Sequence, residues 1–464
     1  MDDNRRKFLK TGAKGAAALA VADRLEAWAA PARVLGANDR VRVGIIGLHG
    51  RGEDHIKGYL ALQNVEIAAL CDVDESVLRQ RVAQLGKAGV QPKTYGDIRK
   101  LLDDKSIDAI SIATPNHWHS LMAIWGCQAG KDVYVEKPCS HNLWEGRQLV
   151  RAAEKYNRVV QHGTQGRSTP AVMEAVAKIR EGLLGDVYLS RGLCYKWRDT
   201  IGHAPVEPVP AGVDYDLWTG PAPMKPFTRN RFHYNWHWIW DTGNGDVGNQ
   251  GVHQMDIARW GLGLRFPNKI SAVGGHFMFD DDQQTPNTLN CAFEYNLAEG
   301  KRVMLEFEVR HWITNHEASI GANSEAQDSA EPHPQLGPMA GSHNTVGNVF
   351  YGSKGYLAIG DGGYRSWLGR DQQPGPSAAE GKEDHFANFI GCVISRKKEE
   401  LRAPIEEGYV SAGLVHLANV SYRLHRTLVF DPESEKVKDD GEANHLLRDG
   451  DRGYRPPFVV PEQV

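Results

Sequence analysis

The sequence predicts an α/β protein of two domains: an N-terminal doubly wound parallel sheet and a C-terminal α+β domain with a large open, predominantly antiparallel sheet. From residue 41 to about residue 161, short apolar strands alternate with helical segments at the spacing of βαβ units. Beyond Gln165 the strand-like runs are longer, which suits an antiparallel sheet. These runs are residues 269–279, 287–295, 302–312 and 348–359.

The clearest strands of the first domain all run into glycine-rich or polar residues. In a doubly wound sheet, ligands bind in the crevice outside the carboxyl ends of the strands, so we expect a binding site along this edge. The strands are residues 41–46, 65–71, 108–113 and 133–135, and the residues that follow them are Gly47, Asp72, Thr114 and the pair Glu136-Lys137.

Length and composition narrow the classes of protein to consider. The 464 residues exceed one ordinary domain and can bury two cores. A formal net charge of −4 gives no electrostatic basis for binding nucleic acid or an anionic membrane surface. The six cysteines are scattered without metal-ligand spacing, so we expect no metal site and no disulfide scaffold, and we interpret them as mostly buried small hydrophobic residues.

The turn after the first strand, Gly47-Leu48-His49-Gly50-Arg51-Gly52, stands where a dinucleotide fingerprint belongs. Its glycines permit a tight turn and let backbone N–H groups approach a pyrophosphate at the helix N-terminus. The turn departs from the G-x-G-x-x-G pattern because His49 occupies the second glycine's place. Asp72 supports the interpretation, since it ends the second strand where a ribose-binding acid is expected, and its charge favours NAD over NADP.

The stretch Lys131-Asp132-Val133-Tyr134-Val135-Glu136-Lys137-Pro138 reads as a buried strand that opens into the same crevice. Pro138 removes a backbone donor and restricts Lys137 to extended geometry, so a helix cannot simply continue the strand. A charged pair at this place costs desolvation energy. The alternative interpretation is a solvated ion pair in a loop.

These motifs resemble the Gfo/Idh/MocA oxidoreductases, a family related to glucose–fructose oxidoreductase and inositol dehydrogenase. The resemblance implies a Rossmann domain that binds NAD and a substrate hydroxyl placed beside Lys137, with His253 as a second proton-handling group. It also implies that residues of both the glycine turn and the later strand ends hold the cofactor. The expected cofactor-binding residues are Gly47, His49, Gly50, Arg51, Gly52, Asp72, Thr114, Pro115, Asn116, His119, Glu136, Lys137 and Gln165.

One position departs from the family. Its dehydrogenases commonly carry an aspartate four residues before the histidine, and this chain has Asn249 there. An amide cannot charge-stabilise an imidazolium as a carboxylate does. We therefore count Asn249 with Lys137 and His253 as catalytic candidates and expect a rewired proton relay, through Asp246, Asp241 or Asp256, or a different chemistry. Asp256 is better suited to bracing its helix.

Aromatic and polar residues crowd the segment from Arg231 to Asp241, next to the presumed active-site helix. Flat ring faces with hydrogen-bonding edges suit a carbohydrate pocket, although the segment could instead pack against a sheet. The expected substrate-binding residues are Tyr195, Trp197, Trp236, His237, Asn249 and His253.

The N-terminus resembles a twin-arginine export signal. Asn4-Arg5-Arg6-Lys7-Phe8-Leu9-Lys10 precedes an alanine-rich, weakly apolar stretch and the cleavage-like Ala27-Trp28-Ala29. The apolar run is too short to span a bilayer in the mature protein, and the alternative is a basic amphipathic helix. We predict a signal peptide over 1–36, a nucleotide-binding domain over 37–165 and a substrate-binding and oligomerisation domain over 166–464.

An exported, periplasmic enzyme has no useful pool of free NAD, so its cofactor must stay bound and be recycled in place. We expect an NAD(H)-dependent oxidoreductase acting on a secondary hydroxyl of a sugar, polyol or glycoside. Two alternatives stay open: a glycoside-cleaving enzyme that uses NAD transiently, and a non-catalytic sugar-binding protein of the same fold. The expected partners are a small carbohydrate, the twin-arginine export machinery and, from the family resemblance, further copies of the chain in a dimer or tetramer.

Overall fold

The computed structural model describes residues 40–320, 344–360, 362–448 and 450–464, with the side chain of Asp451 left undescribed. The predicted signal peptide lies outside these residues. So does most of the segment 318–342, whose Gly, Ser, Pro and His content predicts a long surface loop or insertion. Within the described chain no helix is both long and apolar enough to cross a bilayer.

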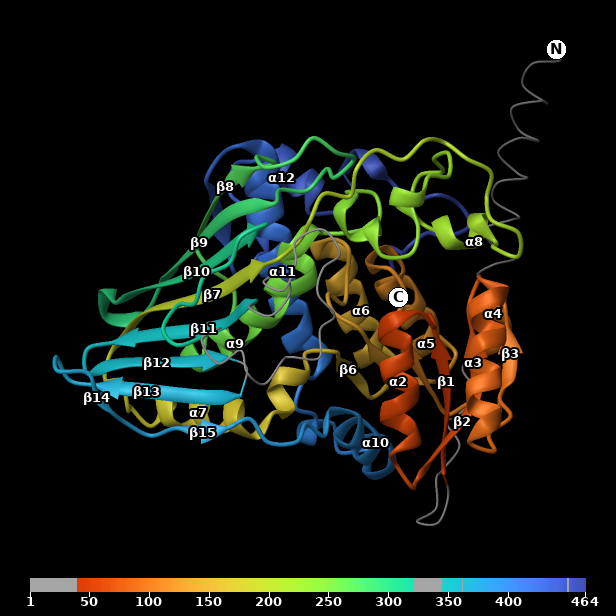
Figure 1. Cartoon of the computed structure of the whole chain (residues 1–464), viewed down its shortest axis with the longest axis horizontal. Helices are drawn as coiled ribbons and strands as arrows, with labels where there is room; N and C mark the ends of the chain where they lie inside the picture. Colours follow the sequence, from red (N-terminus) through yellow and green to blue (C-terminus); the bar gives the residue numbers. More distant parts are fainter. Residues whose placement is uncertain (1–39, 321–343, 361, 449) are drawn as a thin grey trace.

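The N-terminal half is a six-stranded, fully parallel sheet in the order β3-β2-β1-β4-β5-β6 (Figure 1). The order reverses between β1 and β4, and this reversal is the topological switch point at which doubly wound sheets bind ligands. The strands are β1 (Val41–Ile46), β2 (Val65–Cys71), β3 (Lys93–Tyr95), β4 (Ala109–Ile112), β5 (Asp132–Val135) and β6 (Val160–His162). The prediction of a doubly wound parallel sheet is confirmed.

Helices cover both faces of this sheet, because almost every side chain of its central strands is apolar and buried. Side chains from α4 (Ile98–Leu102), α5 (Asn116–Gln128) and α6 (Leu143–Lys155) pack on one face. Those from α2 (Gly50–Leu60) and α3 (Glu75–Lys87) pack on the other, together with α10 (His385–Ser395), which returns from the far part of the chain.

The C-terminal half is an eleven-stranded mixed sheet in the order β14-β13-β12-β11-β7-β10-β9-β8-β16-β17, with β15 paired to β13. Only β7 and β10 pair in parallel among these strands, so the predominantly antiparallel sheet is confirmed. The strands are β7 (Val187–Lys196), β8 (Lys269–Gly275), β9 (Thr288–Asn296), β10 (Arg302–His311), β11 (Thr345–Gly352), β12 (Gly355–Gly360), β13 (Gly363–Leu368), β14 (Gln373–Pro374), β15 (Ala378–Ala379), β16 (Leu428–Asp431) and β17 (Lys436–Val437).

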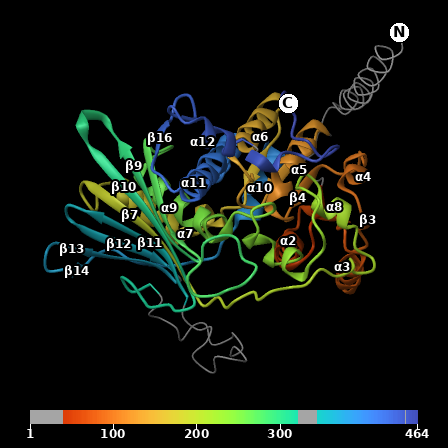
Figure 2. The same cartoon turned by 90° about the horizontal axis from the view of Figure 1, so that it is seen from above.

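Three helices lie between this sheet and the N-terminal half: α7 (Pro170–Arg180), α9 (Val252–Leu262) and α11 (Ile405–Leu424) (Figure 2). Short elements complete the chain. They are η1 (Gln165–Ser168), α8 (Tyr215–Thr219), η2 (Arg229–Arg231), η3 (Asn235–Trp238), η4 (Val247–Gly251), η5 (Ala298–Gly300), η7 (Lys398–Glu400), α12 (Gly441–Leu446) and η8 (Gly450–Arg452).

Two expectations about the C-terminal half were wrong. The run 348–359 is not one strand but the hairpin of β11 and β12, which turns at Ser353 and Lys354. The polar sequence from Asp431 onward predicts a loosely attached tail, but Phe458 and Val460 are buried in the same core as α5 and α6. Val437, Ala443 and Leu447 are buried in this core as well, so apolar side chains spread along a polar segment attach the tail.

A buried ion pair joins η1 to α9. The guanidinium of Arg167 donates two hydrogen bonds to the Asp256 carboxylate, at 2.8 and 2.9 Å, and the Ser411 hydroxyl of α11 donates a third at 2.6 Å. Burial alone would raise the pKa of Asp256, but the Arg167 charge lowers it to about 2. Asp256 therefore braces its helix, as the sequence suggested.

We predict that Asp256→Asn lowers the free energy of unfolding by about 3 kcal/mol or more, because it leaves buried arginine charge uncompensated. The loss relative to wild type should be constant above about pH 5 and should shrink from about pH 4, the ordinary pKa of aspartate, down to pH 2, where the native carboxylate is itself protonated. Urea denaturation across this pH range measures both. The matched control is Asp186→Asn at an exposed pair with Lys301; equal losses in the two variants contradict the account.

Candidate functional site

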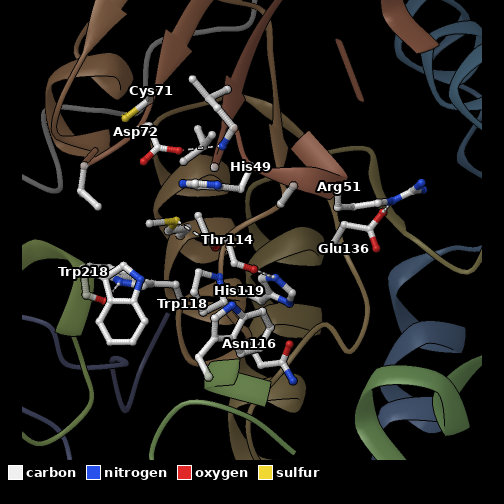
Figure 3. A pocket seen from close by; sticks show the side chains of 18 of the residues that line it. His49, Arg51, Cys71, Asp72, Thr114, Asn116, Trp118, His119, Glu136 and Trp218 are labelled. Carbon is white, nitrogen blue, oxygen red and sulfur yellow. Dashed lines mark hydrogen bonds and ion pairs between the residues drawn. The ribbon is translucent and has the colours of Figure 1, made fainter. Parts of the chain in front are cut away.

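A cavity of about 470 Å³ opens along the carboxyl edge of the parallel sheet (Figure 3). Its floor is formed by the ends of β1, β2, β4 and β5, and its roof by α8 and the segment from Arg229 to Trp240, which we call the covering segment. The volume is typical of small-molecule and cofactor sites. Most of the sequence-predicted residues meet here: Gly47, His49, Gly50, Arg51, Asp72, Thr114, Pro115, Asn116, His119, Glu136, Lys137, Trp236, His237 and Asn249.

Two positions of the glycine turn, Gly47 and Gly52, have no room for a side chain. Gly47 has φ of +81°, and a Cβ atom there would lie 2.7 Å from the Ala113 carbonyl oxygen. A Cβ on Gly52 would lie 1.9 Å from the Gly47 carbonyl oxygen. His49, in place of the second glycine, has extended backbone and directly precedes α2. The turn therefore offers the backbone cradle at a helix N-terminus that a dinucleotide pyrophosphate needs, and the residues present fit NAD.

Asp72 ties the end of β2 to this turn. One carboxylate oxygen accepts a hydrogen bond from the Leu48 backbone N–H at 2.7 Å, and the other accepts one from the Asp74 N–H at 2.9 Å. The side chain lines the cavity beside His49 (Figure 3). Its carboxylate is thus fixed by the backbone in the place where a ribose-binding acid is expected.

The residues after β4 hold the crevice in shape. The Asn116 amide donates to the Asn244 side-chain oxygen at 3.0 Å, which joins the N-terminal half to the loop before α9. The two ring nitrogens of His119 lie 2.7 Å from the carbonyl oxygens of Thr114 and Pro138. His119 therefore connects the residues after β4 to those after β5, and both of its ring nitrogens are used to hold these two segments together.

Glu136 is 3% exposed and receives three side chains. The Arg51 guanidinium donates to it at 2.8 Å and the Gln165 amide at 3.0 Å, while the His55 ring nitrogen lies 3.1 Å away. Burial opposes ionisation, but the Arg51 charge and the His55 hydrogen bond hold the pKa of Glu136 well below its usual range. Gln165, a predicted cofactor residue, reaches the site only through Glu136 and the Tyr134 hydroxyl.

Lys137 crosses from one half of the molecule to the other. Its Nζ donates to the backbone carbonyl of Asn249 at 2.8 Å and to the Asn249 side-chain oxygen at 3.2 Å. Burial lowers the pKa of Lys137 to about 8, although Glu136 acts in the opposite direction. Its third donor position remains available for a substrate oxygen. A lysine with this pKa can exchange a proton near neutral pH.

The carboxylate missing at position 249 is supplied one turn earlier. The Asn249 amide donates to Asp246 at 3.0 Å, and Asp246 is paired with Arg198 at 2.7 Å and with the His311 ring at 2.6 Å. Asn249 lies in η4, a π-helical turn that continues into α9, and such turns are frequent at functional sites. Of the three expected relay acids, the structure connects Asp246; Asp241 instead faces Arg231.

His253 stands one turn of α9 beyond Asn249. Burial and the nearby Lys137 charge lower the pKa of His253 to about 3, so its imidazole is neutral at pH 7. It is not among the residues that line the cavity. The structure thus brings Lys137 and Asn249 into direct contact and places His253 behind them, within the influence of the Lys137 charge.

The two substrate-binding candidates on and after β7 are not in the cavity. Successive side chains of a strand point to opposite faces, so Tyr195 and Lys196 diverge. Tyr195 packs against Val349 on the face away from α9, and its hydroxyl donates to Glu308 at 2.7 Å. Trp197 is bound through its backbone N–H to Asn344 and does not line the cavity. Both assignments are corrected.

Trp236 and His237, in contrast, form part of the cavity wall. Their rings stack at 3.5 Å between centroids. The same wall includes Phe232, His233 and Tyr234, so the covering segment supplies aromatic faces and polar edges together. Sequence reasoning missed Trp118 and Trp218, which also line the cavity (Figure 3). Trp118 directly precedes the predicted cofactor residue His119, so its place in that motif could have indicated it. Trp218 adjoins no such motif, and the fold alone brings it to the cavity.

Comparison with known proteins agrees with this geometry. The Gfo/Idh/MocA oxidoreductase family description with an NAD-binding Rossmann fold matches residues 41–164, and its C-terminal alpha/beta domain matches residues 172–318 and 375–456. A glycosyl hydrolase family 109 protein of Shewanella pealeana is 33% identical over 204 residues, which are 40% of this chain and 44% of that protein. An α-N-acetylgalactosaminidase of Shewanella oneidensis is 33% identical over 156 residues, 32% of this chain and 33% of that one. The chain thus spans less than half the length of these curated relatives.

Two solved structures share the fold over most of the chain. WlbA dehydrogenase from Bordetella pertussis, in complex with NADH and UDP-GlcNAcA, has a TM-score of 0.61 at 19% identity and covers 84% of this chain and 98% of its own. Aldose-aldose oxidoreductase from Caulobacter crescentus, in complex with glycerol, has a TM-score of 0.60 at 17% identity and covers 84% and 100%. With both halves matched and a dinucleotide cradle in place, the chain belongs to the Gfo/Idh/MocA family of NAD-binding oxidoreductases.

Proposed function

We propose that the protein is an NAD(H)-dependent oxidoreductase that acts on a secondary hydroxyl of a sugar, polyol or glycoside and recycles its bound cofactor in place. The observation that carries the proposal is the Lys137 ammonium group, which is half-buried at the edge of the dinucleotide crevice and held by both oxygens of Asn249. Trp236 and His237 provide a wall suited to a sugar ring.

When bound, NAD supplies the hydride acceptor. The chain's own residues handle the proton. A substrate hydroxyl that approaches Nζ can give its proton to the neutral form of Lys137, which a pKa of about 8 makes accessible near neutrality. Asn249 orients the amine, and Asp246 holds Asn249 while it is paired with Arg198 and hydrogen-bonded to His311. The aromatic wall of the covering segment lines the same cavity as Lys137.

A second candidate is a redox-neutral glycosidase that oxidises a sugar, eliminates its aglycone and reduces the product back. Two observations favour it: the relatives named as glycosyl hydrolase family 109 proteins, and the amide at position 249 where the family's dehydrogenases commonly carry an aspartate. Both candidates need Lys137 in the same role. They differ in whether oxidised product accumulates.

We further propose that residues 1–36 direct twin-arginine export to the periplasm, which explains why the cofactor must be bound before export and retained. All six cysteines are buried and unpaired, so an oxidising compartment would not require them to pair. From the family resemblance we propose a homo-oligomer, a dimer or tetramer. Fractionation of cells that produce the full chain and light scattering of the purified protein test the two points separately.

We predict that Lys137→Met lowers kcat by about 10²- to 10⁴-fold and leaves the bound nucleotide in place, because the proton acceptor is lost and the glycine cradle is not. Nucleotide content after denaturation and turnover with a panel of sugars measure the two effects. Lys131→Met is the matched control, since desolvation likewise lowers the pKa of Lys131 to about 8, but its Nζ donates to the backbone carbonyls of Asp104 and Ile107. Full activity of Lys137→Met would refute the assignment.

The pH profile should report the same lysine. We predict that kcat/KM rises with pH to a plateau above about pH 8, as Lys137 loses its proton. Asp246→Asn removes a charge that raises the pKa of Lys137 and should move this limb to lower pH by up to about one unit. Asp241→Asn, whose carboxylate faces Arg231, should leave the limb in place. A limb unmoved in Asp246→Asn rules out the relay.

Aryl glycosides distinguish the two candidate reactions. The redox-neutral enzyme releases the aglycone with no net change in nicotinamide absorbance, and in D₂O its sugar product carries deuterium next to the transiently oxidised carbon. The net oxidoreductase reduces its bound NAD, so the absorbance changes by up to one equivalent per chain until a second sugar reoxidises the cofactor, and it releases no aglycone. Sugar binding with neither signal selects the non-catalytic alternative.

A further inference from the structure

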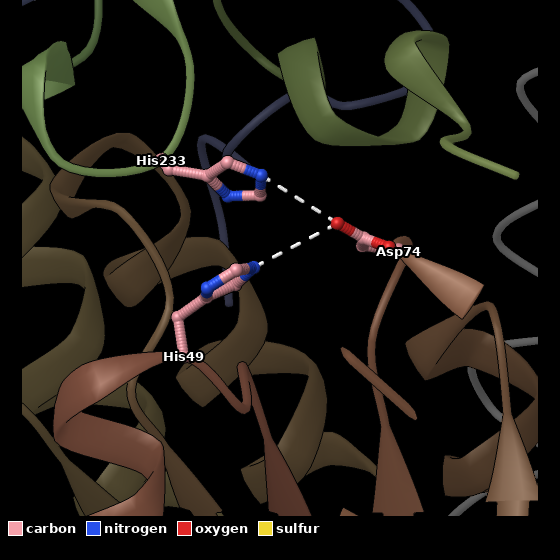
Figure 4. A group of neighbouring side chains, drawn as sticks. All are labelled: His49, Asp74 and His233. Atoms are coloured by element: carbon pink, nitrogen blue, oxygen red, sulfur yellow. Dashed lines mark ion pairs between the residues drawn. The ribbon is translucent and has the colours of Figure 1, made fainter. Parts of the chain in front are cut away.

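Three side chains from three separate elements converge at the mouth of the cavity (Figure 4). They are His49 of the glycine turn, Asp74 after β2 and His233 of the covering segment. One ligand atom of each lies within 4.8 Å of the other two. No other group of histidine, cysteine and carboxylate side chains in the described ranges is arranged so closely.

The two carboxylate oxygens of Asp74 have different surroundings. One oxygen of Asp74 accepts hydrogen bonds from the Ser76 and Val77 backbone N–H groups and from the Ser76 hydroxyl, and so caps α3. The other, Oδ2, accepts no hydrogen bond from the described chain. It faces the Nε2 atoms of His49 at 3.8 Å and His233 at 3.5 Å. The Asp74 side chain is 8% exposed, so this oxygen is aimed into the gap from a buried position.

These separations are too long for good hydrogen bonds but suit ligands around one ion. In a tetrahedral zinc site with bonds of about 2.0 to 2.2 Å, neighbouring ligand atoms are about 3.3 Å apart. A small closure of the three side chains reaches that geometry. Two imidazoles and a carboxylate are common zinc ligands, and the exposed histidines, 47% and 39% for their side chains, leave a path for an ion and a fourth, water ligand.

We propose that His49, Asp74 and His233 form a binding site for one divalent transition-metal ion of the zinc class. The ion joins the covering segment to the glycine turn and to the end of β2, and so fixes the roof of the cavity on its floor. The sequence alone does not indicate the site, because His49 and Asp74 are 25 positions apart and His233 lies a further 159 positions along the chain. The proposal does not depend on which reaction the protein catalyses.

Titration of the untagged full chain with Co²⁺ tests the proposal, because tetrahedral Co²⁺ with nitrogen ligands has characteristic visible absorption and Zn²⁺ displaces it. We expect one equivalent per chain and at least tenfold weaker binding in His233→Gln and in His49→Gln. His203→Gln is the control, since His203 is also exposed and faces two carboxylates, Asp280 and Asp282, outside the site.

A second measurement reports where the ion acts. Zn²⁺ should slow hydrogen–deuterium exchange of the covering segment in wild type and in His203→Gln, and should have no effect on it in His233→Gln. Unchanged exchange and circular dichroism in the metal-free variants show that they remain folded. Absence of the Co²⁺ spectrum, or equal affinity in wild type and His233→Gln, overturns the proposal.

Discussion

The bond between the Lys137 ammonium group and Asn249 is the interaction on which the site depends. Lys137 ends a strand of the parallel sheet, and Asn249 begins the helix that packs on the other sheet. Because the amine is half-buried, its charge is costly, and hydrogen bonds to the two oxygens of Asn249 compensate it without direct contact between Nζ and a carboxylate. The same arrangement leaves the pKa low enough for proton transfer near neutral pH.

The substitution of an amide for the family's aspartate has a clear structural consequence. An aspartate at position 249 would pair with Lys137 directly and raise its pKa. Here the Asp246 carboxylate contacts Lys137 only through Asn249, whose amide donates to it. The same carboxylate also accepts hydrogen bonds from Arg198 and His311. The Asp246 charge therefore supports the geometry of Asn249, and it raises the pKa of Lys137 less than a carboxylate in direct contact would. This keeps the amine closer to the balance between its charged and neutral forms.

Much of the fold and the cofactor half of the site could be predicted, because their signals are local. The glycine turn, Asp72 and the Glu136-Lys137 pair each follow a strand, and parallel strands bring their carboxyl ends to one edge. The substrate half of the site could not be predicted in the same way, because its residues meet only through tertiary structure. Tyr195 lies outside the cavity because one residue along a strand reverses the face, and its neighbour Lys196 instead donates to Gln250 of η4. The return of α10 to the first sheet and the meeting of His233 with His49 join segments more than 180 residues apart, which no local pattern records.

The nucleotide carried by the purified full chain tests this account most directly. Protein prepared without added cofactor is exhaustively dialysed and denatured, and the released small molecules are identified and quantified by mass spectrometry. The account predicts about one equivalent of NAD(H) per chain, retained because the glycine cradle and the roofed cavity hold it. A chain that releases no nucleotide, or that carries NADP instead, contradicts it.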